Sequence, residues 1–146
     1  MSNKIILFLS VFLIFSTSSC KKSRENTGNF QNVKGFSDLP KEFISFYDSF
    51  HADTEYQYNH ISFPMEGHKV IKGEKGDTIE SITWTKKNWK IHKRFDSSDK
   101  SFSQEFIMID DKAVIETISA LNGLFRIERR YAKLSDGWNL IYYAQL

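Results

Sequence analysis

Apolar and polar residues alternate with a period of two over much of the C-terminal third of the chain. Alternation of this kind is typical of strands with one buried face. It predicts four strands, at residues 102–109, 113–121, 124–134 and 138–145. Asn122-Gly123 and Asp136-Gly137 lie between the last three of these strands, and both dipeptides favour tight β-hairpin turns. The last three strands are therefore expected to pair antiparallel.

Two-residue turns at these positions would also fix the register. The first turn places Glu116 opposite Arg129, and the second places Tyr131 opposite Tyr142. Both turns give the same apolar face, and a slip of one residue would reverse every side chain. That face carries Val114, Ile118, Phe125, Ile127, Tyr131, Leu140 and Tyr142, and the opposite face carries Arg126, Glu128, Arg130 and Asn139.

The N-terminal half of the domain shows a helical period instead. An apolar stripe at i, i+3, i+4 and i+7 predicts a helix over residues 40–51, formed by Phe43, Phe46, Tyr47 and Phe50. Asp38 followed by Pro40 signals its start. Thr54 and Gln57 have capping-box spacing, which predicts a short second helix to Asn59.

The middle of the chain is less regular. Residues 61–63 alternate into Pro64 and predict a short strand that ends there, whereas residues 67–76, with three glycines, are expected to form a loop and hairpin. A strand is predicted at 78–84. The segment 85–95 fits either a strand or a helix, and Thr85, a good N-cap, favours the helix. Helices followed by antiparallel strands define an α+β fold, with N-terminal helices packed on a curved sheet.

The N-terminus has the layout of a secretory signal peptide. Lys4 precedes an apolar run over residues 5–15, which as a helix would span about 16 Å, roughly half of a bilayer core. Small residues then lead into Cys20, and this arrangement resembles the lipobox of bacterial lipoproteins. We expect a signal peptide over 1–19 and lipidation (palmitate) at Cys20; an ordinary signal peptide followed by a chance cysteine is the alternative.

Lipidation would place the protein in the cell envelope, anchored to a bacterial membrane. Lys21 and Lys22 differ from acidic surface-export signals and favour the periplasmic side. Residues 20–35 are polar and predict a flexible tether, followed by a single domain over 36–146. The formal net charge of +2 gives no nucleic-acid footprint, and a single Cys excludes a disulfide framework.

Two stretches resemble an uncharacterised lipoprotein family of Bacteroides-type bacteria, domain of unknown function 4348. The first is the Phe-rich helix from Phe43 with Asp53, followed by the run from His60 to Met65. The second is the closing hairpin from Tyr131 through Gly137-Trp138-Asn-Leu140. The resemblance implies a cone-like fold similar to nuclear transport factor 2. It implies no established activity and no catalytic residues.

Candidate chemistry centres on Glu116 and Arg129, which face each other within the apolar face. Together with Tyr131 and Tyr142 they are candidate ligand-binding residues, because polar groups that converge in an aromatic pocket are typical of binding sites. The alternative is a structural cross-strand ion pair. His51, beside Asp48 and Asp53, is either a general base or a cation at a helix C-terminus, where Asp53 caps the next helix.

No catalytic, metal or cofactor site is predicted, because His60, His68 and His92 lack ligand spacing. The basic run 86–94 fits either contact with a membrane surface or a solvated helix face. We therefore expect a membrane-anchored, non-enzymatic domain that binds a small apolar or amphipathic ligand or a protein partner, of unknown oligomeric state. The alternative is an enzyme of the dehydratase or isomerase kind, with Glu116 as its acid/base group.

Overall fold

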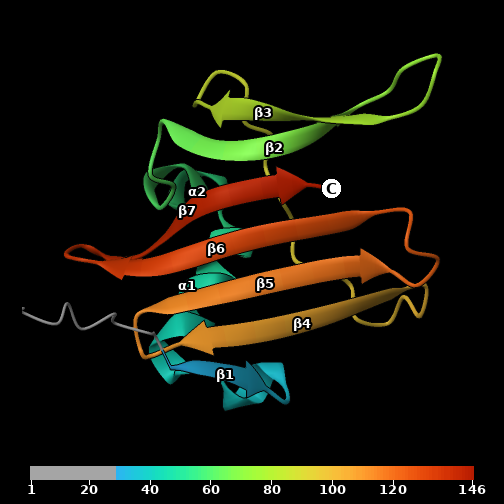
Figure 1. Cartoon of the computed structure of the whole chain (residues 1–146). Helices are drawn as coiled ribbons and strands as arrows, with labels where there is room; N and C mark the ends of the chain where they lie inside the picture. Colours follow the sequence, from blue (N-terminus) through green and yellow to red (C-terminus); the bar gives the residue numbers. More distant parts are fainter. Residues whose placement is uncertain (1–28) are drawn as a thin grey trace, which may run out of the picture.

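The computed structural model of the chain describes residues 29–146, and all of its strands belong to one seven-stranded sheet (Figure 1). The strand order is β1-β4-β5-β6-β7-β2-β3, with antiparallel neighbours except for a short parallel contact between β2 and β7. The elements are β1 (Phe30–Val33), a 3-10 turn (Phe36–Asp38), α1 (Lys41–Ala52), α2 (Thr54–Asn59), β2 (Met65–Ile71), β3 (Thr78–Trp84), β4 (Phe102–Ile109), β5 (Ala113–Ala120), β6 (Arg126–Leu134) and β7 (Gly137–Gln145).

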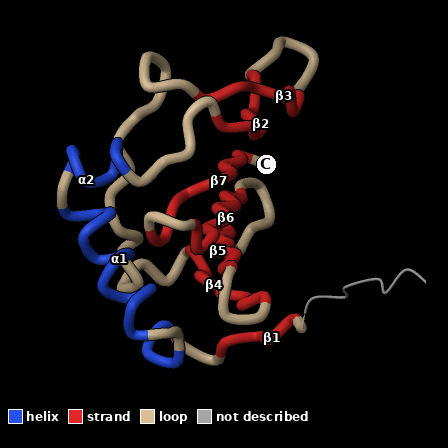
Figure 2. Tube along the Cα trace, turned by 90° about the vertical axis from the view of Figure 1, so that its left-hand side faces the viewer, coloured by secondary structure: helices blue, strands red, loops and turns tan. Residues whose placement is uncertain are grey.

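Both helices lie on one face of the sheet, called here the inner face (Figure 2). The four stripe residues of α1 are buried as predicted, and three of their rings lie 5.4–5.9 Å from the ring of Tyr131 on β6. Burying an aromatic side chain of this size stabilises the fold by roughly 1.5–3 kcal/mol. α2 is also confirmed, and Asp53 caps it by accepting from the Tyr56 N–H at 2.9 Å. Among the described residues, no helix is long and apolar enough to cross a membrane.

The hairpin of β5 and β6 has the predicted register. Glu116 pairs with Arg129, and Val114 pairs with Tyr131. The connection is longer than the expected two residues, because the Ala120 N–H donates to the Phe125 carbonyl at 2.9 Å and leaves four residues in the loop. The loop is longer by one residue on each side, so the residues farther along the two strands keep the same partners. The predicted register is therefore correct although the predicted loop length was wrong.

The hairpin of β6 and β7 differs from the prediction. Leu134 pairs with Gly137, so the loop is Ser135-Asp136, and Tyr131 faces Leu140. An irregularity beside Tyr131 then shifts the pairing by one residue, as an extra residue in one strand does. Arg130 consequently faces Tyr142, and the prediction that placed Tyr142 on the inner face was wrong.

The boundaries around β2 also differ. Residues 61–63 form a single bridge at Ile61 instead of a strand, and β2 begins after Pro64 and runs through Gly67. Gly67 was expected in a loop, but it lies within β2, where a side chain would collide with the Tyr143 carbonyl and the Trp84 indole, so this strand position requires glycine. β3 has the predicted bounds.

The predicted tether was wrong at its C-terminal end, where residues 30–33 form β1. This strand pairs antiparallel with β4, from Phe30 opposite Ile109 to Val33 opposite Phe106. Its side chains are mostly exposed, so the strand is held by backbone pairing and carries no apolar period that its sequence would reveal. The predicted signal peptide and the predicted lipidation site, Cys20, lie outside the described residues.

Residues 85–101, called here the crossing segment, connect β3 to β4 on the helix side of the sheet (Figure 1). The helix expected at 85–95 was wrong, since only a turn at Thr85 is regular and the rest is extended loop. The segment takes this path because it is held by long-range contacts to the helices and the sheet, described below.

Candidate functional site

A buried carboxylate lies at the centre of the inner face. Glu116 on β5 is 0% exposed and accepts hydrogen bonds from four side chains. The donors are the Tyr47 hydroxyl (2.6 Å), Gln104 Nε2 (2.6 Å), Arg129 Nη1 (3.0 Å) and the Tyr131 hydroxyl (3.1 Å). They come from α1, β4 and β6, so the carboxylate joins the helix layer to the sheet.

Glu116 and its four donors are called here the centre. Their surroundings keep Glu116 and Arg129 ionised. Burial favours the neutral acid, but the Arg129 charge and the hydrogen bonds from Tyr47 and Gln104 hold the pKa of Glu116 below its usual value. Burial likewise opposes the guanidinium charge, and Glu116 nevertheless raises the pKa of Arg129. Burial and the Glu116 charge raise the pKa of Tyr47 and of Tyr131. At neutral pH the centre is therefore one ion pair with two neutral phenols.

Two histidines border the same centre. Burial, followed by the Arg129 charge, lowers the pKa of His51 to about 4 and that of His92 to about 3. The His51 ring lies 4.2 Å from the Tyr47 ring, and the His92 ring lies 4.5 Å from that of Tyr143. Both imidazoles are neutral at pH 7, which is against one of the two alternatives considered for His51, a cation at the C-terminal end of α1.

Three buried nitrogen atoms around this centre have no hydrogen-bond partner among residues 29–146: Arg129 Nε, His51 Nε2 and His92 Nδ1. The Arg129 side chain is 5% exposed, and within the part of the chain that the structure describes its one hydrogen bond runs from Nη1 to Glu116. An unsatisfied buried polar group costs about 1–3 kcal/mol, and such groups commonly meet water or a ligand. The centre therefore has unused hydrogen-bonding capacity.

A cleft of about 340 Å³ opens beside Arg129, between the crossing segment and the ends of β4, β5 and β6. Arg94, Asp96 and Asp99 contribute its polar groups, together with Arg129. Its walls are mainly apolar and consist of Phe95, Phe102, Ile118, Phe125 and Ile127. An apolar concavity of this size with a few converging polar groups fits a small-molecule site.

The crossing segment that bounds the cleft is fixed by two contacts with the helices. Gln57 on α2 is fully buried and hydrogen-bonds Trp89 and the backbone of His92. Arg94 forms an ion pair with Asp48 on α1, and its guanidinium lies 4.6 Å above the Phe36 ring. The wall of the cleft is thus positioned by side chains from both helices.

Three of the four candidate ligand-binding residues are brought together by the structure: Glu116, Arg129 and Tyr131. Tyr142 is not among them. Of the trio Asp48, His51 and Asp53, the first two border one hollow, in which Asp48 pairs with Arg94, whereas Asp53 caps α2 instead.

Sequence reasoning missed several residues of the centre and of the cleft wall: Tyr47, Gln104, Gln57 and His92. Tyr47 was assigned to the apolar stripe, and that pattern takes no account of its hydroxyl group. Gln104 lies on the predicted strand 102–109, where an inward-facing polar residue was the available signal. Gln57 and His92 are 35 residues apart and share no local pattern.

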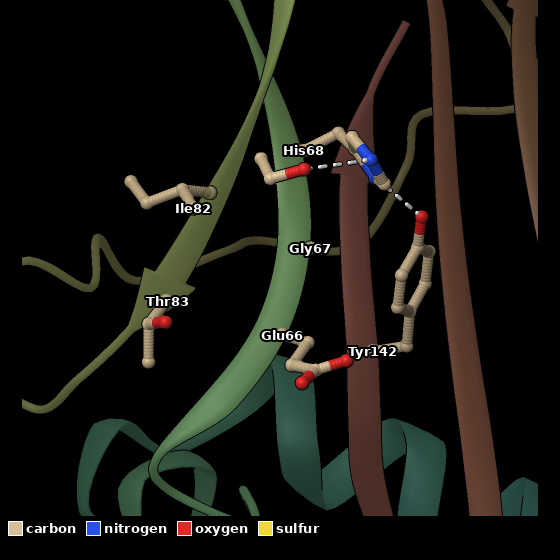
Figure 3. A pocket seen from close by; sticks show the side chains of 7 residues that line it. Glu66, Gly67, His68, Ile82, Thr83 and Tyr142 are labelled. Carbon is tan, nitrogen blue, oxygen red and sulfur yellow. Dashed lines mark hydrogen bonds between the residues drawn. The ribbon is translucent and has the colours of Figure 1, made fainter.

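The face of the sheet away from the helices, called here the outer face, carries a second polar cluster, which is less buried than the centre around Glu116 (Figure 3). His68 on β2 is hydrogen-bonded through Nδ1 to the Tyr142 hydroxyl at 2.8 Å, and its Nε2 lies 3.4 Å from Ser81 Oγ. Arg130 lies 4.2 Å above the Tyr142 ring. In the part of the chain that the structure describes, no three His, Cys, Asp or Glu side chains are grouped to hold a metal ion.

The fold and the site define a small α+β domain with a buried ionic centre beside an apolar cleft. A family model matches residues 41–118, just over half of the chain, and the chain belongs to this uncharacterised family of Bacteroides-type bacteria. No curated protein matches the sequence.

Two solved structures, both of proteins from Bacteroides species, are similar to the chain. One is a cystatin-like protein from Bacteroides caccae, with 18% identity and a TM-score of 0.50 over 70% of this chain and 74% of that one. The other is a nuclear transport factor 2-like protein from Bacteroides fragilis, with 14% identity and a TM-score of 0.49 over 72% of this chain. The chain spans 46% of that second protein's length. At 18% identity the likeness to the cystatin-like protein shows the fold alone.

Proposed function

We propose that this protein is a lipid-anchored binding protein of the cell envelope, facing the periplasm. Its cone-like domain holds a small amphipathic ligand, with the apolar body in the cleft and the polar end at Arg129. The observation that carries the proposal is that Arg129 lines an apolar cleft while its buried Nε has no hydrogen-bond partner among the described residues. An arginine held in this way is preorganised to donate a hydrogen bond to a ligand.

Binding is favoured over catalysis by the state of Glu116. An acid/base catalyst needs a pKa near the working pH and access to the reacting atom. Glu116 is 0% exposed, accepts four hydrogen bonds and has a lowered pKa, so it does not exchange protons readily at neutral pH. Its place in the centre is to hold Arg129.

The ligand part of the proposal is tested by native mass spectrometry of the full chain, purified gently from its own host. We expect a copurifying small molecule. Ile127→Trp fills the cleft, and Ile115→Trp is the matched control, because Ile115 faces Arg130 on the opposite side of the same hairpin. Loss of the adduct in the first variant alone supports the cleft, whereas a bare wild-type protein contradicts it.

The anchoring part rests on the lone Cys20 behind an apolar run that is too short to span a bilayer. Several acyl chains on one cysteine hold a protein on a membrane durably, at about 0.8 kcal/mol per buried methylene. Cys20→Ser is expected to abolish labelling by a palmitate analogue and to release the protein from the membrane fraction. Unchanged membrane retention would overturn the anchor without affecting the cleft.

A further inference from the structure

We infer that the protein has a second ligand site, which binds a small amphipathic anion such as an aromatic carboxylate. The site is a cleft of about 390 Å³ between β2, the end of β7 and residues 88–92 of the crossing segment, called here the tryptophan cleft. It shares no lining residue with the cleft beside Arg129, so the inference goes beyond the proposed function and does not depend on it. Two observations lead to it: the unbalanced positive charge of the tryptophan cleft, and a buried hydroxyl group with an unused hydrogen.

The tryptophan cleft lies where the pairing of β2 with β7 ends. The parallel contact between these strands covers Gly67 and His68. Lys69 and Val70, the next two residues of β2, line the cleft instead, as does Gln145 at the end of β7. β2 stays paired with β3 over its whole length, so the sheet holds this side of the cleft in place.

Aromatic rings supply most of the apolar lining. Four of them line the tryptophan cleft: Trp84, Trp89, His92 and Tyr143. The Tyr143 ring lies 4.5 Å from the His92 ring and 5.3 Å from the Trp84 ring. Trp84 Nε1 donates to the Tyr143 carbonyl at 3.0 Å, and Trp89 Nε1 donates to Gln57 at 3.1 Å. Rings fixed in this way are preorganised to bury the apolar part of a ligand.

The charge of the tryptophan cleft is positive and unbalanced. Lys69 and Lys90 line it, and neither forms an ion pair in the part of the chain that the structure describes. Among residues 29–146, no Asp or Glu lines this cleft. Glu80 faces Lys69 across the pair of β2 and β3, but it is exposed and lies outside the lining. Burial lowers the pKa of His92 to about 3, so that ring is neutral at pH 7 and the cleft favours an anion.

The Tyr143 hydroxyl adds a donor to the two cations. The Tyr143 side chain lines the tryptophan cleft and is 2% exposed. Its oxygen accepts from Gln145 Nε2 at 3.1 Å, and within the described residues its own hydrogen has no acceptor. Burial raises the pKa of Tyr143, so the hydroxyl is protonated at neutral pH and is available as a donor.

A carboxylate matches these groups, because it accepts hydrogen bonds from hydroxyl and ammonium groups alike. Each lysine ammonium is carried on a flexible four-carbon stem, so it can follow the anion within the cleft. A cationic ligand would instead meet two like charges, and a neutral one would leave both lysines without a counter-ion. The apolar body of the ligand would lie against Ile82 and the aromatic rings.

The test uses three probes that share one apolar body: 2-naphthoate, neutral 2-naphthamide and cationic 2-naphthylmethylamine. Each is titrated into the full chain at pH 7.5, and binding is followed by calorimetry and by the ¹H–¹⁵N resonances of the tryptophan indoles. Trp138, whose ring packs 5.0 Å from Phe43 in the core, is the internal control. We expect 2-naphthoate to bind about tenfold more tightly than the other probes. It should shift the resonances of Trp84 and Trp89 and leave that of Trp138 in place.

A double variant tests the lysines. Lys69→Gln with Lys90→Gln removes both charges and is expected to weaken 2-naphthoate binding by about tenfold or more. The melting temperature should not change, because neither ammonium group forms a hydrogen bond among the described residues. Lys75→Gln with Lys112→Gln is the matched control, since both lysines are exposed and lie outside the cleft.

Each outcome bears on the inference alone. Tighter binding of 2-naphthamide or 2-naphthylmethylamine overturns the anion class, and equal affinities of the two double variants for 2-naphthoate overturn the role of the lysines. Binding of 2-naphthoate that shifts neither Trp84 nor Trp89, or no binding at all, overturns the site. None of the variants alters the cleft beside Arg129, so each of these failures leaves the proposed function standing.

Discussion

The side-chain amide of Gln57 is hydrogen-bonded to both backbone polar groups of His92. Its Nε2 donates to the His92 carbonyl at 2.8 Å, and its Oε1 accepts from the His92 N–H at 2.9 Å. The Gln57 side chain thereby forms the two backbone hydrogen bonds with the crossing segment that a neighbouring strand would otherwise form. The same amide also binds Trp89 and the Phe50 carbonyl, at 3.1 and 2.7 Å.

Replacing this amide is expected to destabilise the domain strongly. Gln57→Leu leaves buried backbone groups and the Trp89 indole without partners, at about 1–3 kcal/mol for each unsatisfied group. We expect the free energy of unfolding, measured by urea titration, to fall by about 3 kcal/mol or more. Gln31→Leu, at an exposed position on β1, is the matched control. Similar urea midpoints for the two variants would contradict the role of Gln57.

Breaking the ion pair between Glu116 and Arg129 is expected to lower the free energy of unfolding by about 3–5 kcal/mol. The reason is that removing one charge leaves the other buried without a counter-ion. Glu116→Gln does this to Arg129. Glu128→Gln is the control, since Glu128 on the outer face pairs with arginines whose side chains are about half exposed. A thermal melt of the two variants should show the larger loss for Glu116→Gln, and equal losses would contradict it.

Acidification is expected to destabilise the protein before its carboxylates titrate. Burial lowers the pKa of His51 to about 4 and of His92 to about 3, against an ordinary value of 6.5. Between pH 6.5 and 4.5 the unfolded chain therefore binds more protons than the folded one, so stability is complete above pH 6.5 and falls as the pH decreases. Each group contributes at most about 1.4 kcal/mol per pH unit.

The other charged groups of the centre do not reverse this trend. Arg129 stays protonated throughout, and the lowered pKa of Glu116 keeps that carboxylate ionised above pH 4.5. The urea midpoint is expected to drop from pH 7.5 to 4.5. In the double variant His51→Asn with His92→Gln the dependence should flatten across this window. An equally steep dependence in the double variant would exclude the two histidines as its source.

Gly67 is expected to tolerate no side chain. A β-carbon there would collide with the Tyr143 carbonyl and with Trp84 Nε1, which are themselves hydrogen-bonded at 3.0 Å. Gly67→Ala must therefore separate β2 from β7 or β3, at about 3 kcal/mol. Gly123→Ala, at φ +74 with open space around it, is expected to cost only about 1 kcal/mol. Calorimetric melting of both variants gives the comparison.

Local signals account for the parts of the fold that the sequence predicts correctly. The apolar stripe of α1 and the alternation in β3, β4 and β5 each lie within a single element. The pairing of Glu116 with Arg129 also followed from a local turn, Asn122-Gly123, and this placed the ion pair of the centre without any structure.

The errors arise where distant contacts decide the structure. The crossing segment is extended because Gln57 and Asp48 hold it from the helices, and no pattern within residues 85–95 encodes those partners. Tyr142 was misplaced because the pairing of β6 with β7 shifts by one residue between Arg130 and Tyr131, and the turn at Asp136-Gly137 does not encode that shift. The histidines of the centre were missed as a pair for the same reason, since the chain brings them together only after folding.

β1 also limits how far the domain can stand from its proposed anchor. Ten residue steps separate Cys20 from Phe30, which is at most about 35 Å of fully extended chain. The sheet itself, with six spacings of about 4.8 Å between β1 and β3, is about 29 Å wide. A lipid on Cys20 would thus hold the domain by its β1 edge within roughly one domain width of the bilayer. A small amphipathic ligand dissolved in that bilayer would then reach the cleft without a long path through water.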